Sequence, residues 1–421
     1  MSCIPAPPAQ PIRRRLLHAL AALPLASALP GCGGSPPPAP PAASPPALSD
    51  VPAEWQPLYD TLSAQITSAD AYWAARPVRQ PLPVFSAALL SANTNAGRRL
   101  LQPDALASSL LLLDALAALG LREVNIDIQL PFVLPALGPD HAGYRAFYLQ
   151  LFAAIRARGL RASVELGTTF NDGGFSDVSY DYRTRTEQQY RDDLREQALW
   201  VATALSPSHL TLSNEPDTQR QNTGIDFTPA RWADVIGSTA RAVRTAAPGV
   251  PLSAGTGTWL TAGYVDALLA LPEFDGIDLH LYPLANDWAT GAVESVAQRC
   301  RAAGKSLRFS EAWLYKASPA ELGQNIAAAA DVFKRDVFAF WQPLDIRFLQ
   351  LAARIARGSG AASFNFFWTT YLYGALGWDA SLRDLPYSDL ARRAVAAAAP
   401  NIVARTPNAL GQALARIASG L

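Results

Sequence analysis

Two glutamates stand at the ends of short β-type runs and have the chemistry to act as a pair. Glu215 lies in TLSNEPDTQ, where an apolar-alternating run stops at Asn-Glu-Pro, and Glu311 ends the run SLRFSE. Two neighbouring carboxyl groups can divide the work of bond cleavage, because one attacks as a nucleophile while the other transfers a proton. The two residues are 96 positions apart in the chain (311 − 215), so only a fold can bring them together.

The elements that would position these glutamates alternate regularly from about residue 52 onward, where segments with helical periodicity separate eight β-type runs. Eight such alternations predict an α/β fold, a single (β/α)8 TIM barrel. A doubly wound open sheet is the alternative, but SANTNAGRR after the first run has the wrong glycine spacing for its phosphate loop. The runs are residues 83–90, 123–130, 162–167, 209–214, 250–255, 276–282, 306–311 and 363–368.

Polar and aromatic residues occupy the carboxyl ends of these predicted strands, which is where barrels build their active sites. On strand six a spacing of two places three side chains on one face, toward the interior or mouth of the barrel. We therefore expect two glutamates and a polar-aromatic collar to converge there. The residues are Asn214 and Glu215 on strand four, Asp278, His280 and Tyr282 on strand six, Glu311 on strand seven and Trp368 on strand eight.

On these residues the sequence resembles glycoside hydrolase clan A, the retaining β-glycosidase superfamily with its acid/base after strand four and its nucleophile on strand seven. Asn-Glu-Pro at 214–216 matches the strand-four motif, and FSEAW at 309–313 matches strand seven. The resemblance covers most of residues 80–375. It implies that Glu215 is the acid/base and Glu311 the nucleophile.

The same resemblance implies further contacts to a sugar. Asn214 is the implied partner of the sugar 2-hydroxyl, HLY at 280–282 resembles the clan's strand-six histidine and tyrosine, and Trp368 takes the place of its strand-eight tryptophan. Many members carry an arginine at the end of strand two. Here that place reads Asp127, Ile128, Gln129, so the support of the nucleophile is built differently.

The chemistry of retention gives these residue types a purpose. Retaining cleavage needs two carboxyl groups about 5 to 5.5 Å apart, and the ionised nucleophile raises the pKa of its neighbour so that this neighbour stays an acid. Tyr282 is expected to donate to Glu311 and hold it anionic. The expected substrate is a β-linked oligo- or polysaccharide, cleaved within the chain. Indoles that could stack on sugar rings, or simply pack in the core, are Trp259, Trp313, Trp368 and Trp378.

The sequence allows other interpretations of some residues and of the whole chain. Asp127, Gln129 and Glu165 either contact substrate or only fill a polar layer of the barrel. The whole chain is either an enzyme, a transglycosylase using the same intermediate, or a non-catalytic envelope carbohydrate-binding protein. After residue 50 the histidines are only His141, His209 and His280, with no paired spacing, so we expect no metal and no cofactor.

The N-terminal region reads as an export segment. Basic residues 13–15 and an apolar stretch lead to LPGC at 29–32, which resembles a bacterial lipobox apart from Pro30. We expect residues 1–31 to be a signal peptide, Cys32 to be lipidated, residues 32–50 to form a Pro-rich tether, and 51–421 to be the catalytic domain. An ordinary cleaved export signal is the alternative.

Composition limits the partners. The chain has 35 basic and 35 acidic residues, so its formal net charge of zero favours no binding of nucleic acid. Of three cysteines, only Cys300 lies outside the leader, which leaves no intrachain disulfide framework. We expect an exported monomer in the cell envelope, held to the membrane through a lipid on Cys32 and acting on carbohydrate.

Overall fold

The computed structural model describes residues 50–169, 176–283, 287–318, 321 and 329–420 of the 421-residue chain. The predicted signal peptide, Cys32 and nearly all of the tether lie outside the described residues.

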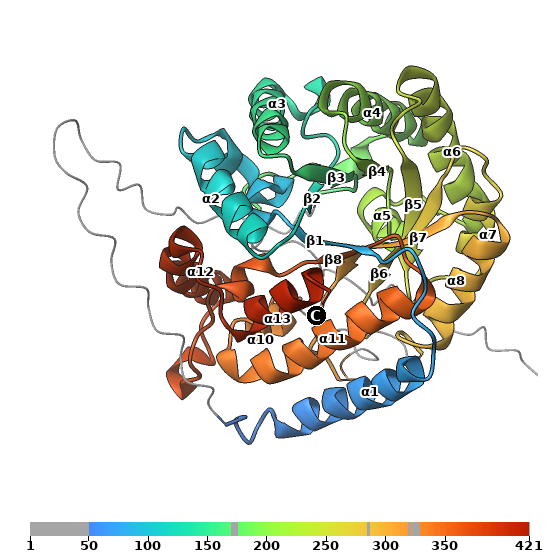
Figure 1. Ribbon diagram of the computed structural model, residues 1–421. Coiled ribbons are helices and arrows are strands. Elements are labelled where there is room, and N and C mark those ends of the chain that lie inside the picture. Colours follow the sequence, from blue (N-terminus) through green and yellow to red (C-terminus); the bar gives the residue numbers. More distant parts are fainter. Residues whose placement is uncertain (1–49, 170–175, 284–286, 319–320, 322–328, 421) are drawn as a thin grey trace, which may run out of the picture.

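Eight parallel strands close into a barrel in chain order, and β8 pairs with β1 (Figure 1). This confirms the predicted (β/α)8 fold and excludes the open-sheet alternative. All eight predicted runs form strands, with ends that move by a few residues. The strands are β1 Val84–Ala88, β2 Glu123–Asp127, β3 Arg161–Glu165, β4 His209–Thr211, β5 Leu252–Gly257, β6 Gly276–Leu281, β7 Ser306–Ala312 and β8 Ser363–Phe366.

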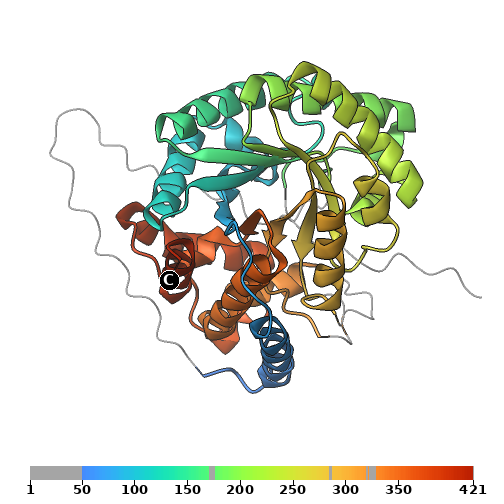
Figure 2. The same cartoon turned by 45° about the vertical axis from the view of Figure 1, so that its right-hand side comes forward.

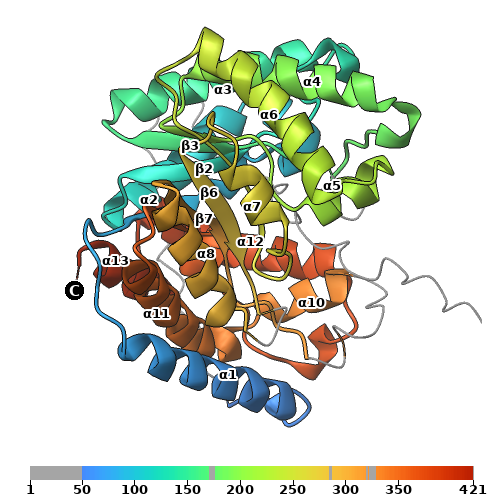
Figure 3. The same ribbon diagram turned by 90° about the vertical axis from the view of Figure 1, so that its right-hand side faces the viewer.

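Helices surround the barrel and cover the apolar outer faces of its strands (Figures 1 and 2). They are α2 Ala105–Ala118, α3 His141–Ala157, α4 Glu187–Trp200, α5 Pro216–Thr223, α6 Pro229–Ala246, α7 Tyr264–Leu269, α8 Gly291–Ala302, α10 Ala329–Asp336 and α11 Gln342–Ser359. Before β1, helix α1, Gln56–Ala74, packs along α11 (Figure 3). The chain ends in α12, Tyr387–Ala404, and α13, Ala409–Ala418. In the described part of the chain no helix is long and apolar enough to span a membrane.

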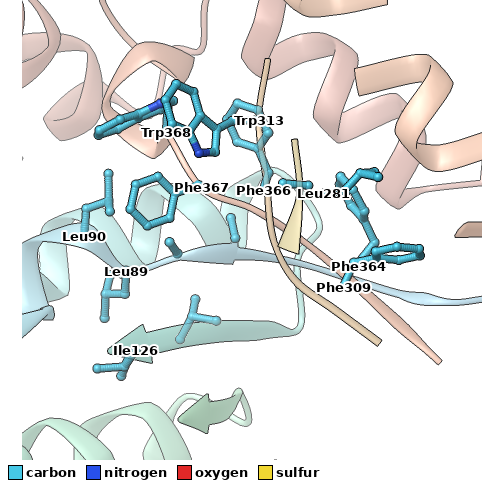
Figure 4. Packing of buried hydrophobic residues seen from close by; sticks show 14 of the residues in the cluster. Leu89, Leu90, Ile126, Leu281, Phe309, Trp313, Phe364, Phe366, Phe367 and Trp368 are labelled. Atoms are coloured by element: carbon cyan, nitrogen blue, oxygen red, sulfur yellow. The ribbon is translucent and has the colours of Figure 1, made fainter. Parts of the chain in front are cut away.

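Strand alternation sorts side chains between two layers. On β2 the buried polar residues Glu123, Asn125 and Asp127 alternate with Val124 and Ile126. Successive side chains of a strand point to opposite faces, so the polar set faces the barrel interior and the apolar set faces the helices. The outer layer is visible in Figure 4, where aromatic and aliphatic side chains from several strands pack together. The interior therefore carries the polar groups that a site at the strand ends can use.

A β-bulge on β7 breaks this alternation where chemistry is expected. Leu279 of β6 pairs with Phe309, but the next pair is His280 with Glu311, so Ser310 is an extra residue. In a regular strand the side chain of Phe309 would point outward, that of Ser310 inward and that of Glu311 outward again. The bulge lets Ser310 and Glu311 both face the interior.

Candidate active site

A small cavity lies at the carboxyl ends of the strands. Its volume is about 30 Å³, which is the space of about one water molecule. Its charged and amide lining comes from β2, β3, β4, β6 and β7, from the residues that directly follow them, and from Gln219 of α5. Six predicted site residues meet there with Glu165, namely Asp127, Gln129, Asn214, Glu215, His280 and Glu311.

Glu215 reaches this cavity through an unusual turn. Strand β4 ends at Thr211, earlier than predicted, and Glu215 has left-handed backbone angles, φ 54° and ψ 69°. A following proline disfavours right-handed helical geometry, and a non-glycine residue in the left-handed region stores strain that is typical of functional sites. Pro216 does not stop the chain from forming a helix, since it opens α5 at a position where proline is tolerated. The hydroxyl of Thr218 donates to Glu215 Oε2 at 2.7 Å.

The nucleophile candidate is braced through its neighbour Ser310. The backbone N–H of Ser310 donates to Asp278 Oδ1 at 2.8 Å, and Thr211 Oγ1 donates to Asp278 Oδ2 at 2.6 Å. Asp278 therefore faces the barrel interior as predicted, but it lies below the cavity lining and ties strands β4 and β7 together. Because Ser310 forms the bulge, this contact also fixes the position of Glu311.

His280 is the centre of the site and joins three carboxyl groups. Its Nδ1 lies 2.8 Å from Glu215 Oε1 and 3.6 Å from Glu311 Oε2, and its Nε2 lies 2.8 Å from Glu165 Oε1. Because one nitrogen contacts both glutamates, the two oxygens are separated by no more than the sum of 2.8 and 3.6 Å, which is 6.4 Å. The fold thus brings together the two residues that are 96 positions apart in the sequence.

Charge and burial set the protonation of this cluster. Burial disfavours an imidazolium, but the carboxylates of Glu165 and Glu311 and the hydrogen bonds to Glu165 and Glu215 outweigh it and raise the pKa of His280 well above its ordinary value. Burial, together with Glu165 and Glu311, raises the pKa of Asp127 well above its ordinary value. His280 is therefore the cation of the cluster, and Asp127 holds a proton.

Glu311 was expected to be ionised, but its surroundings favour the protonated form. Burial raises its pKa to about 8, supported by Glu165 and Glu215 and opposed by His280 and by a hydrogen bond from Tyr282. Tyr282 acts on the pKa of Glu311 in the predicted direction. It does not hold Glu311 anionic at neutral pH, because burial among carboxylates is the larger effect. That part of the sequence interpretation is wrong for the protein alone.

Asn214 already uses its donors within the protein. Its Nδ2 lies 2.9 Å from Glu165 Oε1, 3.0 Å from Ser310 Oγ and 3.0 Å from His280 Nε2. A side-chain amide has two N–H donors, so both are engaged. The role implied by the resemblance, a donor to a sugar hydroxyl, would need one of these bonds to break.

The predicted aromatic residues gather beside the charged cluster, with one exception. Trp259 stacks on Tyr282 with ring centroids 5.5 Å apart, and Tyr282 meets Trp313 edge to face at 5.5 Å. Trp313 in turn meets Trp368 at 5.2 Å, and Figure 4 shows these two indoles next to each other. Trp313 and Trp368 are buried, whereas Trp259 is half-buried and donates from its indole nitrogen to Asp217. Within the described residues, Trp259 is the one of the three with an accessible surface.

Trp378 lies elsewhere. It packs edge to face against Trp55 at 6.3 Å and Phe338 at 4.7 Å, in a cluster next to α1. It contributes nothing to the cavity lining.

Sequence reasoning missed two supports and left one residue open. Thr218 and Ser310 were not singled out, because neither the turn at Glu215 nor the bulge at Ser310 is visible from residue types alone. Glu165 was left between a contact and a filler, and the structure places it against both His280 and Asn214. Among the described residues, no group of three or more His, Cys, Asp or Glu is arranged to hold a metal ion.

Comparison with known proteins gives structural likenesses only. No protein-family model matches the sequence, and no curated protein matches it. An exo-β-1,4-mannosidase from Opitutaceae bacterium strain TAV5 is 18% identical with a TM-score of 0.47, over 75% of this chain and 60% of that one. The chain thus spans less than two thirds of that protein's length.

Two further solved structures are similar over more of their own length. A glycoside hydrolase family 5 mannosidase from Rhizomucor miehei is 13% identical with a TM-score of 0.48, over 79% of this chain and 95% of that one. An endo-1,4-β-D-mannanase from Thermotoga petrophila RKU-1 is 10% identical with a TM-score of 0.43, over 68% and 94%. With these identities and scores, the likenesses assign no substrate or activity to this chain.

Proposed function

We propose that the protein is a retaining β-glycoside hydrolase that cleaves a β-linked oligo- or polysaccharide within the chain by double displacement. The observation that carries the proposal is the contact of one nitrogen of His280 with both Glu215 and Glu311, which limits their oxygens to a separation of 6.4 Å. Retaining enzymes hold the two carboxyl groups about 5 to 5.5 Å apart, whereas inverting enzymes leave about 6.5 to 9.5 Å for a water molecule.

In the first step Glu311 attacks the anomeric carbon and forms a covalent glycosyl ester, while Glu215 gives its proton to the departing glycosidic oxygen. In the second step Glu215 takes a proton from water, and this water attacks the same carbon and releases Glu311. Two inversions give net retention. Glu215 is the member that can exchange protons through His280, since these two side chains are hydrogen bonded at 2.8 Å.

Tyr282 and His280 favour the ionised form of Glu311 that the attack requires. A hydrogen bond from Tyr282 and the charge of His280 both lower the pKa of Glu311, against the effect of burial. The cavity of about 30 Å³ is too small for a sugar ring, so we place the ring above this floor, with the half-buried Trp259 as a stacking surface.

The decisive experiment combines product stereochemistry with trapping. The protein is screened against β-linked polysaccharides and aryl β-glycosides, and the anomer formed first is identified by NMR. A 2-deoxy-2-fluoro aryl β-glycoside should then leave a covalent adduct on the peptide that contains Glu311, seen by mass spectrometry. An inverted first product would rule out the retaining mechanism.

A matched pair of variants separates an enzyme from a binding protein. Glu311→Ala should abolish release of reducing sugar while leaving glycan binding intact. Glu215→Ala should retain slow cleavage of substrates with good leaving groups, and added azide should accelerate it and yield a β-glycosyl azide. A wild-type protein that binds a glycan but cleaves none would support the carbohydrate-binding alternative. Analysis of products at high acceptor concentration separates transglycosylation from hydrolysis.

We also propose that this activity is located outside the cytoplasm, in a monomeric, membrane-anchored lipoprotein of the cell envelope. The support is the basic-apolar leader that ends in LPGC at 29–32. Cys32→Ser should move the full-length protein from the membrane fraction to the soluble envelope fraction and stop incorporation of labelled fatty acid. Unchanged fractionation would contradict the anchor.

A further inference from the structure

The cavity at the strand ends has a large excess of carboxyl groups. Asp127, Glu165, Glu215 and Glu311 all line it, and all are buried. Among the described lining residues, the one side chain that can carry a positive charge is His280. Burial keeps Asp127 and Glu311 protonated in the protein alone, but a buried carboxylate such as that of Glu165 is costly unless it is paired and fully hydrogen bonded.

Several of these acceptors have no protein partner. Glu165 uses Oε1 to bind His280 and Asn214, but its buried Oε2 has no hydrogen-bond partner among the described residues. The same holds, in that part of the chain, for Glu311 Oε1 and for both amide atoms of Gln129, a side chain that is only 1% exposed. Three of these four atoms are acceptors and Gln129 Nε2 is a donor. Buried polar atoms are normally paired, so the three acceptors indicate a ligand that supplies hydrogen-bond donors.

The donors of Asn214 are engaged and the cavity is small. Both N–H groups of Asn214 are used within the protein, on Glu165 and Ser310. A volume of about 30 Å³ accepts a group about as large as one water molecule. An ammonium group has this size, carries only donors and can pair with a carboxylate.

The position of Glu165 relative to Glu311 says where on the sugar such a group would be. The two carboxyl groups contact opposite nitrogens of one imidazole ring, that of His280. With Glu311 at the anomeric carbon, we place the substituent of the neighbouring ring carbon beside Glu165, on the other side of the imidazole ring. We propose, on the basis of the proposed glycosidase function, that the substrate is a β-linked 2-amino-2-deoxy sugar with a free ammonium group, which pairs with Glu165 in this cavity.

The test uses substrates that differ only at that carbon. Aryl β-glycosides with an amino, N-acetylamino or hydroxyl group at C2 are compared in the gluco, galacto and manno configurations, together with chitosan, chitin and cello-oligosaccharides. We expect the amino member to have the highest kcat/KM in at least one series. The N-acetyl member should be the poorest, because its neutral, bulkier group neither fits the cavity nor pairs with a carboxylate.

Variants then assign the preference to one side chain. Glu165→Gln should lower the ratio of kcat/KM for amino over hydroxyl substrates on the order of 10- to 100-fold, and Glu165→Asp should restore part of it. The matched control is Glu123→Gln, which removes another buried carboxyl that pairs with Arg161 and Arg308 and does not line the cavity. This control should leave the ratio unchanged. Thermal unfolding shows whether each variant is folded.

The outcomes separate the two proposals. Cleavage of neutral β-glycosides in preference to amino ones in every series, or a ratio that Glu165→Gln does not change, would overturn the ammonium site while the glycosidase function stands. If no β-glycoside is cleaved, the glycosidase function fails, and calorimetry with chitosan and cello-oligosaccharides decides the ammonium site. Binding of the chitosan oligosaccharide alone supports it, and equal or absent binding of both rejects it.

Discussion

Two buried acidic clusters meet near the end of β7, where Glu311 of one and Lys316 of the other are five residues apart (316 − 311), and they differ in how many carboxyl groups share each cation. In the structural cluster, Lys316 Nζ lies between Asp336 Oδ1 at 2.5 Å and Asp345 Oδ1 at 2.7 Å, and the lysine is 2% exposed. In the catalytic cluster, His280 is shared by Glu165, Glu215 and Glu311. One cation contacts two carboxyl groups in the first cluster and three in the second.

The difference lies in what the charges connect. Lys316 joins the segment after β7 to the end of α10 and the start of α11, so its ion pairs connect three parts of the chain. The cavity cluster connects strand ends and leaves acceptors directed into a cavity. A buried charge cluster that connects packed elements supports the fold, whereas one that borders a cavity is available to a substrate.

The largest expected effect separates the clusters by activity. Glu311→Gln removes the nucleophile and should lower kcat/KM on the order of 10⁴-fold, with an unchanged circular dichroism spectrum. The matched variant Asp345→Asn, in the structural cluster, should retain measurable activity under all conditions in which this variant is folded. Equal losses in the two variants would contradict the distinction.

The next effect separates the clusters by stability. Lys316→Met leaves Asp336 and Asp345 buried without their cation, and it should lower the free energy of unfolding by about 3–5 kcal/mol, measured with urea at pH 7. His280→Gln should cost less, because carboxyls that border a cavity can take up protons instead. A larger loss for His280→Gln than for Lys316→Met would reverse the assignment of the two clusters.

The stability of the catalytic cluster should also depend on pH. The pKa of Glu311 is raised to about 8 in the folded protein. The stabilisation linked to this proton is complete below the unfolded pKa of about 4.3 and is lost as pH rises through 8. Glu311→Gln should therefore unfold less readily than wild type above pH 8, on the order of 1–3 kcal/mol. Parallel unfolding curves at pH 5 and pH 9 measure it, and the same difference at both would contradict the linkage.

The smallest effect concerns the pH profile of catalysis. Since Glu311 must be ionised to attack, the acid limb of kcat/KM should fall near pH 8 instead of in the usual range of a glutamate. Tyr282→Phe removes a hydrogen bond that lowers the pKa of Glu311, so this limb should move to higher pH. A limb that stays in place or moves down would show that Tyr282 does not act on Glu311.

The sequence predicted much of the fold because strands of a barrel have simple rules. Eight alternating runs were enough to place Glu215, His280 and Glu311 at one end. It could not predict where long-range contacts go: that Glu165 binds the far side of His280, or that Trp313 and Trp368 pack against each other. These depend on the register and tilt of neighbouring strands, which a single run of residues does not specify.

Local departures from regular backbone geometry could not be predicted from the sequence either. Regular alternation of side chains along β7 puts Arg308 and Ser310 in the barrel interior. The structure agrees, because Arg308 lies 3.6 Å from Glu123 and Ser310 binds Asn214. Glu311 has the opposite parity, so its inward position required a bulge that residue types alone do not announce. The left-handed turn at Glu215 is similar, since Pro216 excludes one conformation without selecting another.

The bulge at Ser310 makes function depend on the length of a strand as well as on its side chains. Removing Ser310 alone would restore regular pairing between β6 and β7 and put Glu311 directly after the outward Phe309, so the glutamate would still face the interior. The deletion would instead remove the backbone N–H that binds Asp278 and the hydroxyl that binds Asn214. The extra residue thus sets the position of Glu311, and losing one codon would change that position while leaving every proposed catalytic side chain in the gene.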